Sequence, residues 1–167
     1  MININTLKDR FISGSIVEKL IYINIAVFIL TFIFQLFQGS PENQINWFVD
    51  WFSLDDDYNS LLKKPWSIIT YGFLHADFIH ILMNLIVLHF IGNLFLEYFT
   101  QKQLLNFYLI GTFFGGLLFV FSQNYFPLFE RESSLLVGAS AGISAIFIGI
   151  ATYMPNYQLN VRFIGFV

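Results

Sequence analysis

The sequence predicts an all-α fold, a bundle of helices that cross a membrane several times, and both composition and patterning support it. Hydrophobic residues make up 56% of the 167 residues and charged residues 11%, whereas a soluble domain carries roughly 25% charged residues. The apolar residues gather into four long runs, each close to the about 20 residues that a helix needs to cross a bilayer. Disorder is excluded, because disordered chains are rich in charge and poor in aromatic residues.

The four predicted spans follow one another along the chain as residues 20–37, 78–99, 104–121 and 135–154. The first run contains no charged residue and is rich in Ile, Phe and Leu, which favours a transmembrane helix. Short polar joints separate the last three runs, and Pro155 ends the fourth. We therefore expect one membrane domain over residues 1–167, since the length also fits a single domain.

A longer segment, residues 38–77, separates the first two spans and differs from them in composition. It opens with the helix breakers Gly39 and Pro41, and it holds all three tryptophans and the acidic run Asp55–Asp57. Tryptophan and tyrosine favour the boundary between membrane and water. We expect this segment to lie on or partly in that interface.

The distribution of lysine and arginine favours a cytoplasmic N-terminus, because cytoplasmic loops carry an excess of these residues. This orientation places five of them inside and three outside; the inner group is Lys8, Arg10, Lys19, Lys102 and Arg162. The compact N-terminus fits a bacterial inner-membrane protein. The partners expected on composition are the lipid bilayer and no nucleic acid, because the net charge is −3 and no basic run is present.

The second span is unusual because it carries five polar residues within an otherwise apolar helix. His80 and Asn84 fall within about 40° of each other on a helix, and His89, Asn93 and Glu97 cluster on roughly the opposite face. Polar groups inside a span are costly and often functional, but they also form ordinary hydrogen bonds between helices. We interpret the second group as such helix contacts, and both interpretations stay open for the first.

The fourth span begins with a serine between two glycines, Gly138-Ala-Ser140-Ala-Gly142. At a helix N-terminus the free N–H groups and the positive end of the dipole favour a developing oxyanion beside the serine. Small residues also suit close helix packing in membranes, which is the more common explanation of this pattern. Gly111 and Gly115 form a second small-residue pattern, and we interpret it only as a close helix contact.

Taken together, two of these patterns resemble one known family. The run His75-Ala-Asp-Phe-Ile-His80-Ile-Leu-Met-Asn84, followed one span later by the Ser140 motif, resembles the rhomboid family of intramembrane serine proteases. The pair of motifs, HxxxxHxxxN and then GxSxG, is much more specific than either motif alone. The resemblance covers roughly residues 66–154. It implies a rhomboid-like bundle with four transmembrane helices present of an expected six, and transmembrane protein substrates.

The resemblance also implies roles for five residues. Ser140 matches the nucleophile, and His80 and Asn84 match the side chains that form the oxyanion hole with the Ser140 backbone N–H. Gly138 matches the glycine beside the oxyanion site, and His75 matches a histidine that supports structure and hydration at the cavity mouth. The reaction would be acyl transfer through an acyl-enzyme. We expect no metal and no organic cofactor.

The general base that the resemblance implies, a histidine on the sixth helix, is not in this chain. The three histidines, His75, His80 and His89, all precede Ser140. One explanation is an ordinary rhomboid truncated after its fourth helix, whose missing C-terminal helices complete the domain; the apolar restart at 161–167 favours it. A second is an inactive rhomboid-like protein that binds transmembrane segments, and a third, more distant one is half of a transporter or channel.

Overall fold

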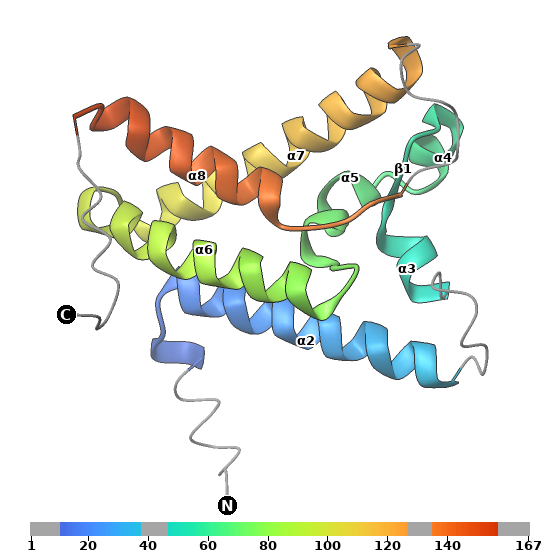
Figure 1. Cartoon of the computed structure of the whole chain (residues 1–167), viewed down its shortest axis with the longest axis horizontal. Helices are drawn as coiled ribbons and strands as arrows, with labels where there is room; N and C mark the ends of the chain where they lie inside the picture. Colours follow the sequence, from blue (N-terminus) through green and yellow to red (C-terminus); the bar gives the residue numbers. More distant parts are fainter. Residues whose placement is uncertain (1–10, 38–46, 127–134, 157–167) are drawn as a thin grey trace, which may run out of the picture.

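The computed structural model describes residues 11–37, 47–126 and 135–156. Within these ranges the chain is a bundle of helices, with short elements gathered at one end (Figure 1). The four helices of the bundle are α2 (Ile16–Phe37), α6 (Phe78–Tyr98), α7 (Gln101–Tyr125) and α8 (Ser140–Tyr153). The short elements are α3 (Trp47–Phe52), β1 (Leu54–Asp55), α4 (Tyr58–Lys63), α5 (Ser67–Thr70), a 3₁₀ turn η1 (Tyr71–Phe73) and β2 (Leu135–Leu136).

The prediction of an all-α membrane helix bundle is confirmed. Three described helices, α2, α6 and α7, are long and apolar enough to cross a membrane. The fourth, α8, is apolar but has 14 residues. It occupies Ser140–Tyr153, whereas the sequence predicted a span over 135–154, because the residues before Ser140 form a strand and a turn.

Side-chain caps fix the ends of the central helices. Asp77 caps α6, since its Oδ1 accepts a hydrogen bond from the His80 N–H at 2.8 Å. Thr100 and Gln103 form a reciprocal capping box at the start of α7. Only two residues separate the end of α6 from the start of α7, so the two helices run in opposite directions.

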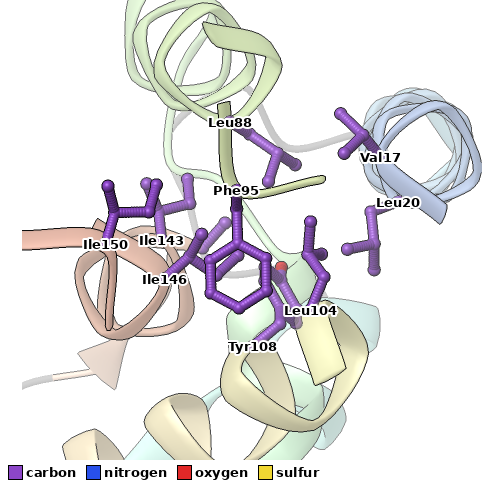
Figure 2. Packing of buried hydrophobic residues seen from close by; sticks show 10 residues of the cluster. Val17, Leu20, Leu88, Phe95, Leu104, Tyr108, Ile143, Ile146 and Ile150 are labelled. Carbon is purple, nitrogen blue, oxygen red and sulfur yellow. The ribbon is translucent and has the colours of Figure 1, made fainter. Parts of the chain in front are cut away.

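The bundle is held by one buried cluster to which all four helices contribute (Figure 2). Helix α8 packs on α7 and α6, and α2 packs on α6. In a membrane such contacts are stabilised by van der Waals packing more than by exclusion of water. The labelled members of the cluster are Val17, Leu20, Leu88, Phe95, Leu104, Tyr108, Ile143, Ile146 and Ile150.

The short elements form a compact unit because side chains further along the chain form hydrogen bonds with the carbonyl groups at the C-terminal end of α3. The last carbonyl groups of a helix have no partner within it. Here three of them accept side-chain hydrogen bonds: Asp50 O from Lys64 Nζ at 2.7 Å, Trp51 O from Trp66 Nε1 at 2.9 Å and Phe52 O from Thr70 Oγ1 at 2.7 Å.

The tryptophans of this unit are partly exposed, with Trp51 and Trp66 stacked at a ring-centroid distance of 5.6 Å. An interfacial position for residues 38–77 stays a prediction, and residues 38–46 of that segment lie outside the described ranges.

Candidate active site

A short strand and a left-handed turn set the position of Ser140. Strand β2 pairs antiparallel with β1, with Leu136 opposite Leu54. Two residues later Gly138 has a φ of +126°, a backbone conformation that glycine adopts far more readily than any residue with a side chain. The chain then enters α8 with Ser140 as its first residue and exposed at the surface. The extended backbone of β2 and the turn at Gly138 explain why the helix does not begin at residue 135.

His80 and Ser140 meet around Gly138. A Cβ atom placed on Gly138 would lie 2.8 Å from His80 Nε2 and 3.9 Å from Ser140 Oγ. The lack of a side chain at Gly138 therefore lets the imidazole approach the backbone closely, with the hydroxyl nearby. The structure thus brings together three of the residues singled out from the sequence, from two elements far apart along the chain.

Asn84 lies one turn further along α6 than His80, and its side chain bonds within that helix. Its Nδ2 donates a hydrogen bond to the backbone oxygen of His80 at 2.9 Å. A side-chain amide carries two N–H donors, so one of them is left for another acceptor. Asn84 is buried, and it shares a face of α6 with His80 as the spacing predicted.

His75 is buried beside His80, just before α6 begins. The two imidazole rings meet edge to face at a centroid distance of 5.1 Å. Neither ring nitrogen of His75 forms a hydrogen bond with the described residues, and the residue is 4% exposed. Burial lowers the pKa of His75 to about 4, and the neighbouring His80 acts in the same direction. His75 is therefore neutral at neutral pH.

The second polar group of α6 lies away from this site, on an exposed part of the helix. Asn93 Nδ2 donates to the backbone oxygen of His89 at 2.7 Å, so this bond lies within α6. Among the described residues, no hydrogen bond of the kind that the sequence suggested joins His89, Asn93 or Glu97 to another helix. In the same ranges, no group of three or more His, Cys, Asp or Glu side chains is arranged to hold a metal ion.

Comparison with known proteins assigns the family. A family model for the rhomboid domain matches residues 62–167, a range that contains the His80 motif, the Ser140 motif and the whole of the site described above. The chain belongs to the rhomboid family. No curated protein and no solved structure matches it.

The family assignment makes this rhomboid an integral, multi-pass membrane protein, in agreement with its three long apolar helices. Rhomboids are generally serine proteases that act on membrane proteins within the bilayer. The resemblance seen in the sequence is therefore confirmed at the level of the family.

Sequence reasoning missed the tyrosines beneath the site of this rhomboid. The Tyr71 hydroxyl donates to Thr112 O at 2.7 Å, and the Tyr108 hydroxyl donates to Gly72 O at 2.9 Å. A tyrosine within a strongly apolar run is a usable signal, because a buried phenol needs a hydrogen-bond partner. The identity of that partner depends on the fold, and no local pattern reveals it.

Proposed function

We propose that this rhomboid is an intramembrane serine endopeptidase that cleaves transmembrane segments of membrane proteins, with Ser140 as nucleophile. The observation that supports the proposal is the convergence of His80 Nε2 and Ser140 Oγ beside Gly138, where the absence of a side chain lets the imidazole approach. A peptide carbonyl placed between the imidazole and the hydroxyl would meet a hydroxyl on one side and a hydrogen-bond donor on the other. That is the arrangement that acyl transfer needs.

In this mechanism the Ser140 hydroxyl attacks the carbonyl carbon and negative charge develops on the carbonyl oxygen. We assign three donors to that oxyanion: the Ser140 backbone N–H, His80 Nε2–H and the N–H of Asn84 that does not bond to His80 O. The N-terminus of α8 adds the positive end of a helix dipole. Collapse of the intermediate breaks the C–N bond, and the amine product leaves with the proton that the general base removed from Ser140. Water then hydrolyses the acyl-enzyme.

The proton of Ser140 needs a general base, and none of the described histidines suits that role. His75 is a weak base because its pKa is held near 4. His80 is assigned as a donor to the oxyanion, and His89 lies on roughly the opposite face of α6 from His80. We propose that a histidine from sequence following Val167 completes a Ser–His dyad, as the family resemblance implies.

The test uses the full-length protein, with any sequence that follows Val167, reconstituted in liposomes with a model transmembrane substrate. We expect the wild type to cleave and Ser140→Ala to abolish cleavage. Ser144→Ala is the matched control, because Ser144 is an exposed serine one turn further along α8, and it should retain full activity. His80→Ala and Asn84→Ala should each lower kcat by up to about 10²–10³.

Two results would contradict the proposal. Undiminished cleavage by Ser140→Ala would remove Ser140 as the nucleophile. A wild-type protein that binds the substrate without cleaving it, and whose Ser140 does not react with a fluorophosphonate, would instead identify an inactive rhomboid-like binder.

A further inference from the structure

Tyr71 lies beneath the site and is fixed at both its side chain and its backbone. Its side chain is almost fully buried, with the residue 1% exposed. The hydroxyl donates to Thr112 O of α7 at 2.7 Å. The Tyr71 backbone oxygen accepts two hydrogen bonds, from the Gly138 N–H at 3.0 Å and from the Leu74 N–H at 3.2 Å.

These two backbone bonds join the chain segments that carry the two halves of the site. The bond from Leu74 closes the turn that leads to His75 and on to the start of α6, where His80 lies. The bond from Gly138 holds the turn that leads directly to Ser140. One carbonyl oxygen therefore holds together the segment that leads to His80 and the segment that leads to Ser140.

The Tyr71 ring packs against α7 at two adjacent glycines, Gly115 and Gly116, which have no side chains in its way. A Cβ atom on Gly116 would lie 2.9 Å from Tyr71 Cε1, and one on Gly115 would lie 3.1 Å from the Tyr71 hydroxyl. The same Gly115 position is 2.6 Å from the Cβ of Ala141, the residue that follows Ser140. The ring therefore fills the space between α7 and the first turn of α8.

We propose that Tyr71 is a positioning residue, which sets the separation of Ser140 and His80 by anchoring their shared backbone contact to α7. The proposal rests on the proposed function of Ser140. Tyr71 itself touches neither the substrate nor the reacting atoms. It acts through the Gly138 N–H and through the packing of Ala141.

The hydrogen bond from the Tyr71 hydroxyl does not depend on pH in the physiological range. Burial raises the pKa of Tyr71 to about 12, so the hydroxyl stays protonated and donates to Thr112 O throughout the physiological pH range. Loss of this hydroxyl would leave the Thr112 carbonyl without that donor. It would also free the ring, and with it the Tyr71 carbonyl that holds Gly138.

The test compares Tyr71→Phe with Thr70→Val in the full-length protein. Each variant removes one side-chain hydroxyl whose hydrogen bond to a backbone carbonyl is 2.7 Å long. The two residues are neighbours, but Thr70 bonds to Phe52 O of α3, away from the Ser140 turn. Any general loss of stability should therefore be similar, and an effect on the site should be confined to Tyr71→Phe.

We expect Tyr71→Phe to lower kcat about tenfold or more with KM unchanged, because small displacements of a reacting group have large effects on rate. Thr70→Val should keep kcat within about twofold. Amide hydrogen exchange gives a readout that does not depend on activity: the Gly138 amide should exchange faster in Tyr71→Phe than in Thr70→Val or the wild type.

The outcomes separate this inference from the proposed function. An inactive wild type would contradict the proposed function and leave the exchange experiment to decide whether Tyr71 holds Gly138. Unchanged exchange at Gly138 in Tyr71→Phe would overturn the inference. So would an active Tyr71→Phe enzyme with the kcat of the wild type, or an equal loss of kcat in Thr70→Val.

Discussion

Gly138 is the residue on which the geometry of the site depends most directly. It combines a φ of +126° with close packing of the His80 ring against its backbone, beside Ser140. We predict that Gly138→Ala lowers stability by about 1–3 kcal/mol through backbone strain. It should also reduce kcat about tenfold or more, because the new methyl group displaces the His80 ring. Thermal unfolding and cleavage of a model substrate, both in detergent, measure the two effects.

Gly149→Ala is the control that separates crowding from damage to the site. A Cβ atom at Gly149 would lie 2.7 Å from Phe107 Cε1, so this variant also crowds the interior. Gly149 lies within α8 and has no contact with His80. We expect lower stability with kcat preserved. Equal losses of kcat in the two variants would show that Gly138 matters only for packing.

At the scale of single residues, the sequence predicted the members of the site whose chemistry is defined by residue type and spacing alone. Ser140, Gly138 and His80 were singled out from their motifs, and the structure brings them together. The bond between Tyr71 and Thr112 joins residues 41 positions apart. Such a contact follows from how the turn before α6 folds against α7, so no local pattern could indicate it.

Among the helices, the contact between α7 and α8 confirms the sequence prediction for Gly111 and Gly115. Gly111 faces the Cβ of Ala145, and Gly115 faces the Cβ of Ala141. The boundary of α8 was less predictable than this contact. Residues 135–139 are as apolar as a helix in a membrane, and only the pairing of β2 with β1 and the turn at Gly138 keep them out of it.

This contact predicts a compensating pair of substitutions. Gly111→Ala adds a methyl group directly against Ala145 and should lower the free energy of unfolding by about 1–3 kcal/mol. The double variant Gly111→Ala with Ala145→Gly moves that methyl group across the interface and should recover most of the loss. Unfolding of the wild type, both single variants and the double variant in mixed micelles gives the coupling energy. Additive effects would show that the two residues do not share a contact.

For the molecule as a whole, the structure places the short elements and the candidate site at the same end of the bundle. Strand β1 pairs with β2, which lies just before Ser140, and Asn124 near the end of α7 donates to Asp56 O at 2.7 Å. The turn between α6 and α7, which precedes Lys102, lies at the other end. Lys63 and Lys102 therefore mark opposite ends of the helices.

These two lysines give a direct test of orientation, since residues 1–167 contain no cysteine and a thiol introduced at either position is the only one within them. Both side chains are exposed. With a cytoplasmic N-terminus, Lys63→Cys should react with a membrane-impermeant maleimide in intact cells, and Lys102→Cys should react mainly after permeabilisation. The reverse pattern would place the candidate site on the cytoplasmic side. The lysine and arginine balance that favours this orientation is five to three. Lys102→Cys itself changes that balance to four to three, whereas Lys63→Cys changes it to five to two, so the fraction of inverted molecules should be larger in Lys102→Cys than in Lys63→Cys.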